Sequence, residues 1–524
     1  MKVVFRVDAS LEIGTGHVMR CLTLAQVLKD NGASVDFICR QHEGNLIDKI
    51  RSREFDVYEL ELLEESEVDT KLSHSRWLGV TQKQDADDCI NILKLKETDW
   101  LILDNYALDE DWHCKLKPYY EKLIVIDDLL DRKHRCDILL NHTFGCQQND
   151  YAAFVPNNCK LLLGSQYALL RPEFVKWRVY SLERRSKPDF KQLFINMGGV
   201  DIDDITGQVV KELQTCALPS NINIVIVMGG FTPHLEDVRI AADALPYKTE
   251  IKVDVDNMAE IMANADIAIG ASGSTTWERC CLGLPTIQIA IAKNQILSAK
   301  MLAHHNAVKL VTEIKEVGHL LENSAEWMEN IGVTASQICD GKGAYKVFNR
   351  MSDYKITLDN FGDFELCNYI NLNMDDKILA LNMRNHPRIR KWSYNQKSIS
   401  KKDHVEFIEN LENETDRRYF LIKQQNNIIG SFNFRKINFH NSAEFGIYTN
   451  PFIQSRGAGS LLEAVASQYA FIELGVKKII SEVLSDNERA INFFKKHRFE
   501  LVNTRKINHQ NICDFEKDKI LEKV

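Results

Sequence analysis

The residues that could do chemistry first appear near the start of the chain, in the run Asp8 to Arg20. Its centre contains Gly14, Gly16 and His17, and Arg20 follows three positions after the histidine. The first turn of a helix presents unpaired N–H groups and the positive end of the dipole, which favour a phosphate. The same partial charge disfavours an imidazolium, so a histidine there could accept a proton from water. The pattern predicts phosphate binding and base catalysis at one loop; a histidine that only caps a buried loop is the alternative.

The elements that position this loop follow from hydrophobic periodicity. Residues 2–7 form an apolar, β-branched run of strand length, and helical spacing begins after Gly16. Apolar strands then alternate with amphipathic segments as far as residue 140, which is typical of a parallel sheet with helices on both faces. We interpret the charged segment 59–88 as an irregular excursion over the surface. The apolar face of the first helix comprises Val18, Cys21, Leu22, Ala25 and Leu28.

Polar residues follow several of these strands. Asp104 and Tyr106 end one strand, and Asp127 and Asp128 end the next. Ligands of open parallel sheets bind beyond the carboxyl ends of the strands, so we expect these side chains to gather around the His17 loop. Helix capping and loop turns are the alternative explanation of such aspartates.

A second α/β series begins after the charged stretch 182–189, which we interpret as a domain joint. Its first strand, residues 193–197, leads directly into Gly198 and Gly199. A glycine pair after a strand again allows the backbone to turn tightly at the end of the sheet.

The sharpest pattern of this second series is a loop of small residues that reaches Ser274 and Thr275. Its N–H and hydroxyl groups can surround a pyrophosphate. Glu278 has two interpretations: it forms a capping box with Thr275 as the N-cap, or it accepts the paired hydroxyls of a ribose. The local pattern slightly favours the cap. Asn294, which follows the apolar strand 286–292, could reach the same cleft.

The composition limits the classes of function. The chain has 524 residues, of which 44% are hydrophobic and 27% charged, and this indicates a globular protein of three or four compact units. The net charge of −9 argues against general affinity for nucleic acid or anionic membranes. The 13 cysteines are scattered without paired spacing, so we expect reduced thiols in a cytoplasmic protein and no zinc module. We find no apolar run long enough to span a membrane.

Five motifs of the first half resemble those of the UDP-2,4-diacetamido-2,4,6-trideoxy-β-L-altropyranose hydrolases of pseudaminic acid synthesis. The resemblance extends over residues 1 to about 345 and implies a GT-B-type pair of Rossmann-like domains, similar to the glycosyltransferase that makes lipid II. It implies that His17 activates water to attack the anomeric carbon with inversion, which releases UDP and the free sugar without a metal. The motifs are residues 14–20, 103–106, 126–129, 196–199 and 273–278.

The same resemblance assigns UDP mainly to the second domain. Gly198 and Gly199 would meet phosphate together with Ser274 and Thr275, and Glu278 would hold the ribose. The resemblance therefore raises Glu278 from a cap to a ligand, although it could serve as both. Further substrate-binding candidates are Gly14, Gly16, Arg20, Asp104, Tyr106 and Asn294.

The pattern changes in the second half of the chain. Residues 341–353 are interpreted as a linker, and shorter strands and basic helices follow. Residues 419–434 contain two strands of a predicted hairpin. The strand 444–449 leads to the loop 454–459, which reads Gln-Ser-Arg-Gly-Ala-Gly and precedes a long helix. A glycine loop at a helix N-terminus again fits a pyrophosphate, and Arg456 adds positive charge.

This order of elements resembles the GNAT N-acetyltransferases. Phe494 stands where many members carry a tyrosine that protonates the leaving thiolate, so water or a nearby hydroxyl such as Ser485 would have to serve. Glu444 is a candidate base for the amine, although strand alternation could equally turn it to solvent. The resemblance assigns acetyl-CoA to the pyrophosphate loop residues Gln454, Arg456, Gly457 and Gly459, and to Asn487 and Asn492 beside the pantetheine arm.

These patterns predict an α/β protein with a GT-B-type pair of Rossmann-like domains, residues 1–185 and 186–350, followed by an α+β GNAT domain, residues 351–524. We expect a bifunctional enzyme. The GNAT domain would use acetyl-CoA to acetylate the 4-amino group of UDP-4-amino-4,6-dideoxy-N-acetyl-β-L-altrosamine, and the first half would hydrolyse the product. The acceptor is inferred only from the pairing of the halves. The alternatives are a UDP-sugar glycosyltransferase, a hydrolase for another nonulosonic acid, and a GNAT domain that only binds acetyl-CoA.

Overall fold

The structure is a computed structural model that describes residues 1–62, 71–187, 189–230, 232–291, 295–425, 427–439, 441–453, 456–507 and 510–519. Its residues form two compact units, one of residues 1–26 and 34–344 and the other of residues 27–33 and 345–524. The predicted boundaries at residues 185 and 350 stay predictions. None of the helices in the described ranges is both long and apolar enough to cross a bilayer.

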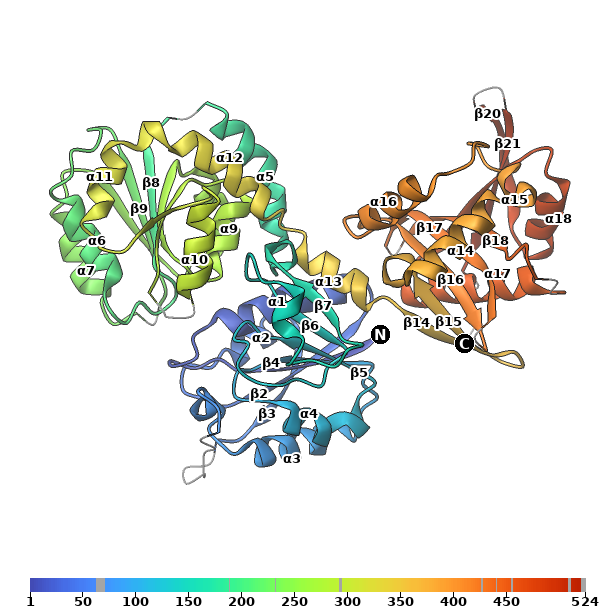
Figure 1. Cartoon of the computed structure of the whole chain (residues 1–524), viewed down its shortest axis with the longest axis horizontal. Coiled ribbons are helices and arrows are strands. Elements are labelled where there is room, and N and C mark those ends of the chain that lie inside the picture. The colour runs from blue at the N-terminus through green and yellow to red at the C-terminus, as the bar shows by residue number, and fades with distance from the viewer. Residues whose placement is uncertain are drawn as a thin grey trace. The chain divides into compact units, whose positions relative to one another are not determined.

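The first sheet is seven-stranded and parallel, in the order β3-β2-β1-β4-β5-β6-β7 (Figure 1). All five residues of β1 after the first are buried, as expected for a central strand covered on both faces. The strands are β1 Lys2–Val7, β2 Ser34–Arg40, β3 Asp56–Leu60, β4 Trp100–Asp104, β5 Lys122–Ile126, β6 Ile138–Asn141 and β7 Lys160–Leu163. The helices are α1 Gly16–Asp30, α2 Ile47–Arg51, α3 Gln82–Leu93 and α4 Glu110–Leu116.

Helices α1 and α3 illustrate how the sequence builds this layer. The five residues predicted to form the apolar face of α1 are all buried, which confirms that prediction. The segment 59–88, by contrast, is not only an excursion, because α3 begins at Gln82 and buries Ala86, Cys89 and Leu93 against the sheet. These buried residues of α3 have helical spacing, but the charged residues between them made the segment look irregular in the sequence.

The second sheet is six-stranded and parallel, in the order β10-β9-β8-β11-β12-β13. Its strands are β8 Gln192–Asn196, β9 Asn223–Met228, β10 Lys248–Val253, β11 Ile267–Ala271, β12 Thr286–Ile289 and β13 Lys309–Val311. Helices cover both faces, with α6 and α7 on one side and α5 and α9 on the other (Figure 1). The helices are α5 Pro172–Arg185, α6 Ile205–Leu213, α7 Leu235–Asp243, α8 Met258–Asn264, α9 Thr275–Cys281, α10 Gln295–His304, α11 Glu316–Glu322 and α12 Met328–Ile338.

The predicted linker 341–353 contains the boundary between the two compact units, at residues 344 and 345, and it is helical, because α13 spans Gly343–Met351. This helix buries Ala344, Val347 and Phe348, so its apolar face packs against the protein.

The third sheet is eight-stranded and mainly antiparallel, in the order β14-β15-β16-β17-β18-β19-β21-β20. The exception is the pair β18 and β19, which runs parallel over three registered pairs, from Ser442–Lys478 to Glu444–Ile480. The strands are β14 Tyr354–Leu358, β15 Gly362–Asn368, β16 Arg418–Gln424, β17 Asn427–Asn438, β18 Ser442–Thr449, β19 Lys478–Leu484, β20 Glu500–Ile507 and β21 Gln510–Asp518. The predicted hairpin is confirmed as β16 and β17.

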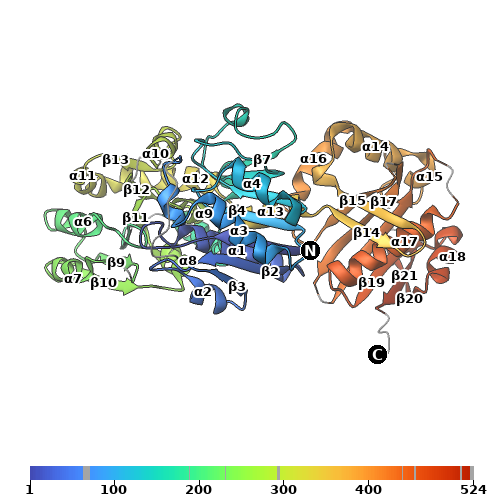
Figure 2. The ribbon, with the colours of Figure 1, turned by 90° about the horizontal axis from the view of Figure 1, so that it is seen from below.

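Helices lie on both faces of this sheet. Figure 2 shows α14 and α16 on one face and α17 on the other, and the two apolar clusters of this unit follow the same division. The helices are α14 Met374–Asn385, α15 Pro387–Arg390, α16 Lys401–Leu411, α17 Ala458–Gln468 and α18 Glu488–Lys496.

Candidate active sites

His17 is held by a carboxylate from the neighbouring strand. It stands in the first turn of α1, and its Nδ1 lies 2.6 Å from Oδ1 of Asp104, the last residue of β4. Arg20, one turn further along α1, donates to both oxygens of the same carboxylate at 2.6 Å. Because β1 and β4 are adjacent parallel strands, the loop after β1 and the end of β4 meet at one edge of the sheet. The structure therefore brings His17, Arg20 and Asp104 together, as their positions in the sequence predicted.

This geometry fixes the tautomer of His17. Burial favours a protonated Asp104, but Arg20 and His17 outweigh it and hold the pKa of that carboxyl well below its usual range. The carboxylate can only accept hydrogen bonds, so the 2.6 Å contact requires that Nδ1 of His17 carries a proton. In the neutral ring Nε2 is then the proton acceptor, which is the state that a general base needs.

The predicted glycines lie in two loops, one after β1 of the first sheet and one after β8 of the second. Gly14 has φ of +79° and Gly198 of +99°, a conformation that glycine adopts at little cost. A Cβ placed on Gly14, Gly16 or Gly198 would meet no atom within 4 Å, so the space above these residues is open. A Cβ on Gly199 would lie 3.3 Å from the Thr15 hydroxyl, so the loop after β8 lies against the loop after β1.

Aromatic rings form one wall beside His17. The Tyr106 ring lies edge-on to the imidazole, with 4.7 Å between ring centroids, and its hydroxyl donates to Asp128. Burial and Asp128 raise the pKa of Tyr106 far above its ordinary value, so this phenol stays protonated. Trp77 stacks on Tyr106 at 5.6 Å, and His74 packs edge-on against Trp77.

The second sheet contributes the start of α9, and here the expected capping box is wrong. Ser274, rather than Thr275, is the N-cap, and its φ of −57° and ψ of −30° are already helical, so no side-chain cap forms. The Thr275 hydroxyl instead accepts from Nη1 of Arg279 at 3.0 Å. Glu278 is left without the cap, and Arg171 Nη2 lies 3.9 Å from its Oε1. Burial raises the pKa of Glu278 to about 7, although Arg171 lowers it in part.

Two of the predicted site residues, Asn294 and Gln454, lie outside the described residues. No group of three or more His, Cys, Asp or Glu side chains in the described ranges is arranged as a metal site. The contacts between the substrate and the predicted binding residues stay predictions.

In the third sheet, the predicted acetyl-CoA loop ends at the N-terminus of α17. Gly457 is the N-cap of this helix, with φ of +83° and open space where a side chain would stand. Arg456 is exposed beside it. Gly459 faces the Phe493 ring of α18, since a Cβ there would lie 3.2 Å from that ring. Asn487 caps α18 by accepting from the Ala490 N–H at 3.2 Å, whereas Asn492 is exposed on the helix.

Glu444 and Phe494, the two residues discussed for base and acid chemistry, both contact other side chains of the protein. Glu444 is the last residue paired between β18 and β19, and its carboxylate binds Lys436 and lies 3.6 Å from Arg435. Phe494 is only 4% exposed and packs with Phe445, Phe499 and other rings of the core, so it is a core residue. The role of Glu444 stays a prediction.

Comparison with known proteins follows the division between the sheets. Residues 193–335 match the model of the glycosyltransferase family 28 C-terminal domain, and residues 384–499 match that of the acetyltransferase (GNAT) family. The N-terminal part is similar to a UDP-2,4-diacetamido-2,4,6-trideoxy-β-L-altropyranose hydrolase of Campylobacter jejuni, with 32% identity over 305 residues, 58% of this chain and 96% of that protein. The C-terminal part is 31% identical to the acetyltransferase PseH of the same species over 149 residues, 28% of this chain and 92% of that protein.

The N-terminal part of the chain belongs to the family of the altropyranose hydrolase, and the C-terminal part to the family of the acetyltransferase PseH. The chain is an enzyme of the hydrolase and acetyltransferase classes, with GT-B-type and GNAT folds. An uncharacterised protein of Methanocaldococcus jannaschii is 25% identical over 510 residues, 95% of this chain and 97% of that protein, so the two-part arrangement is not peculiar to this chain. Below, residues 1–344 are called the hydrolase part and residues 345–524 the GNAT part.

Sequence reasoning missed one side chain near His17 in the hydrolase part, Trp77, and it grouped His142 with the polar strand ends expected near the His17 loop. Trp77 lay in the segment that was interpreted as irregular. His142 follows β6, and its buried Nδ1 has no hydrogen-bond partner in the described part of the chain. Burial, together with the positive charge of Arg20, lowers the pKa of His142 to about 4.

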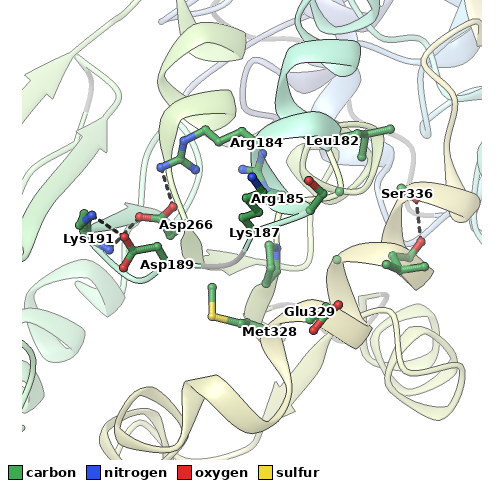
Figure 3. A pocket seen from close by; sticks show the side chains of 15 residues that line it. Leu182, Arg184, Arg185, Lys187, Asp189, Lys191, Asp266, Met328, Glu329 and Ser336 are labelled. Atoms are coloured by element: carbon green, nitrogen blue, oxygen red, sulfur yellow. Dashed lines mark hydrogen bonds and ion pairs between the residues drawn. The ribbon is translucent and has the colours of Figure 1, made fainter.

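A cavity of about 580 Å³ lies elsewhere in the hydrolase part, at the end of the second sheet where β8, β11 and β12 begin (Figure 3). Arg184 pairs with Asp266 at 2.5 Å across it. Arg185 donates to carbonyl oxygens at the end of α8, among them those of Met262 and Ala265. These arginines are thus occupied in holding α5 to the sheet, and the cavity contains none of the predicted site residues.

Proposed function

We propose that the hydrolase part converts UDP-2,4-diacetamido-2,4,6-trideoxy-β-L-altropyranose to UDP and the free sugar. The observation that carries this proposal is the His17–Asp104 pair at 2.6 Å beside an open glycine loop, in a chain of the hydrolase family. A neutral His17 would take a proton from water at Nε2 while the water oxygen bonds to the anomeric carbon. The bond from that carbon to the UDP oxygen breaks, and the sugar leaves with inverted configuration.

The residues around the His17–Asp104 pair would hold UDP, the leaving group. The N–H groups at the start of α1, and the open backbone at Gly198 and Gly199, suit an anion such as a diphosphate. Glu278 has lost its capping role, so its carboxyl group is available to accept ribose hydroxyls. Asp104 and Arg20 would act on the reaction by fixing the orientation of His17.

For the GNAT part we propose transfer of an acetyl group from acetyl-CoA to the 4-amino group of UDP-4-amino-4,6-dideoxy-N-acetyl-β-L-altrosamine. The product of this step is the substrate proposed for the hydrolase part, so the chain would catalyse two consecutive reactions. The registered pairs of β18 and β19 end at Glu444 and Ile480, and a thioester could lie between the two strands beyond that point. The amine nitrogen would bond to the acetyl carbon as the carbon–sulfur bond breaks, and Glu444 would take the proton that the amine loses. Water or Ser485 would supply the proton that the thiolate takes up.

Product analysis by NMR tests both steps in the full-length chain. Wild type given acetyl-CoA and the UDP-4-amino sugar should yield UDP and the free 2,4-diacetamido sugar. His17→Ala should stop at the acetylated UDP-sugar, and Gly457→Val should leave the amine unchanged because its side chain fills the CoA loop. His319→Ala, an exposed histidine of α11, is the matched control and should behave as wild type.

The outcomes separate the two proposals. Wild type that stops at the acetylated UDP-sugar contradicts the hydrolase proposal alone. A chain that acetylates nothing, yet hydrolyses the synthetic diacetamido UDP-sugar, contradicts the proposal for the GNAT part alone. Release of UDP only when a second sugar is supplied would identify a glycosyltransferase.

A further inference from the structure

A chain of polar contacts connects the first turn of α17 to β21 through the end of α18. The Ser460 hydroxyl lies 3.0 Å from Nε2 of His497. Nδ1 of His497 lies 3.1 Å from Oε2 of Glu463, whose other oxygen lies 2.6 Å from Nζ of Lys517. Ser467 completes the set by donating to Glu463 at 2.6 Å and accepting from Lys517 at 3.0 Å.

This chain of contacts from Ser460 to Lys517, called the relay below, begins at the proposed acetyl-CoA loop. Ser460 is the third residue of α17, directly after Gly459, and is partly exposed. Glu463, in contrast, is only 3% exposed. The outer end of the relay is therefore open to a ligand at the helix N-terminus, and the inner end is a buried ion pair.

The proton positions along the relay allow two states. Glu463 pairs with the Lys517 ammonium and accepts at 3.1 Å, so Nδ1 of His497 carries a proton in both states. In the neutral ring Nε2 can only accept, and the Ser460 hydroxyl must give it its one proton. In the imidazolium Nε2 donates to the Ser460 oxygen, and the hydroxyl proton is free to be donated elsewhere.

We propose that the Ser460 hydroxyl donates a hydrogen bond to the diphosphate of CoA, and that His497 enables this by becoming an imidazolium when CoA binds. This inference rests on the proposed function of the GNAT part. It makes Ser460 a ligand of the cofactor and His497 a positioning residue that acts through it. It also requires that CoA binding take up a proton from solvent.

The charges around His497 agree with this direction of coupling. Burial lowers the pKa of His497; Glu463 opposes this effect, and Lys517 and Lys496 reinforce it. The ring is accordingly neutral at neutral pH before the cofactor binds. A diphosphate beside Ser460 brings negative charge that favours the imidazolium, so binding and proton uptake support each other.

Isothermal titration calorimetry of the full-length protein tests the proposal. CoA is titrated at pH 7.5 in buffers of different ionisation enthalpy, which gives the number of protons taken up. Dephospho-CoA retains the diphosphate but lacks the 3′-phosphate, and pantetheine lacks both. Wild type should take up a substantial fraction of a proton with CoA and with dephospho-CoA, and none with pantetheine.

Two variants separate this role from a structural one. His497→Gln should bind CoA about as tightly as wild type without the extra proton uptake, because its amide donates to Ser460 at any pH. Ser460→Ala should bind CoA and dephospho-CoA about tenfold more weakly and pantetheine unchanged, as expected for loss of one hydrogen bond to a charged group.

Several results would overturn the inference. Equal proton uptake by wild type and His497→Gln excludes the relay, and so does wild-type affinity of Ser460→Ala for dephospho-CoA. In both cases acetyl transfer by the GNAT part still stands. Absence of CoA binding by wild type overturns that proposed function as well, so the two failures are distinguishable.

Discussion

Replacing Asp104 by asparagine should slow hydrolysis by about 10³- to 10⁴-fold. The carboxylate lies 2.6 Å from Nδ1 of His17 and can only accept. An asparagine can turn its amide N–H toward Nδ1, and the ring proton then moves to Nε2, where no lone pair remains for water. A loss of this size corresponds to about 4 to 5.5 kcal/mol of transition-state stabilisation.

The same substitution also removes the partner of Arg20, so stability must be measured separately. Arg20 makes two 2.6 Å contacts with Asp104, and loss of one partner of a buried ion pair typically costs about 3 to 5 kcal/mol. Asp85→Asn is the matched control. Asp85 is a buried aspartate of the same sheet layer that binds Arg6 at 2.6 Å and Arg40 at 2.9 Å, away from His17. It should lose comparable stability and keep its turnover.

The assay is UDP release from the diacetamido UDP-sugar, with urea unfolding of each variant. We expect a large fall in kcat for Asp104→Asn alone, with little change in KM. A folded Asp104→Asn protein whose kcat lies within tenfold of wild type would refute the argument that Asp104 sets the tautomer. Equal falls for both aspartate variants would show that the loss comes from stability.

Three further predictions concern other buried groups. Glu278→Gln should stabilise the protein at pH 8 by about 2 to 3 kcal/mol in urea unfolding, because a carboxyl with a pKa of about 7 opposes folding as pH rises from about 4 to 7. The same substitution should weaken UDP binding, and unchanged UDP affinity would contradict the ribose role. Asp85 has a pKa lowered to about 2, so its contribution to stability, complete above pH 4, should be lost as pH falls toward 2, and Asp85→Asn should show a flatter acid profile by circular dichroism. Phe494→Tyr should destabilise the GNAT part by about 1 to 3 kcal/mol without raising acetyl transfer, because the new hydroxyl is buried; faster transfer would mean that the ring reaches the thiolate.

The sequence by itself determined the features that depend on neighbours along the chain. The strand, glycine loop and helix around His17, the buried face of α1, and the hairpin of β16 and β17 all follow from local periodicity and turn chemistry. The order of strands and glycine loops also predicted two parallel sheets and a GNAT sheet. Local pattern failed where charge hid helical spacing, as in α3, and it did not show that the predicted linker is helical, as at α13.

The sequence predicted that polar strand ends gather near His17, and only the tertiary structure decided which of their atoms meet and in what protonation state. Asp104 lies 87 positions from His17, and the two meet because β1 and β4 are neighbours in the sheet. Trp77 reaches the same edge from a segment without a clear sequence signal. Thr275 and Glu278 had the spacing of a cap, yet the helical geometry of Ser274 prevented it. The relay from Ser460 to Lys517 likewise joins two helices and a strand, because hydrogen bonds depend on separation in space and only indirectly on separation in sequence.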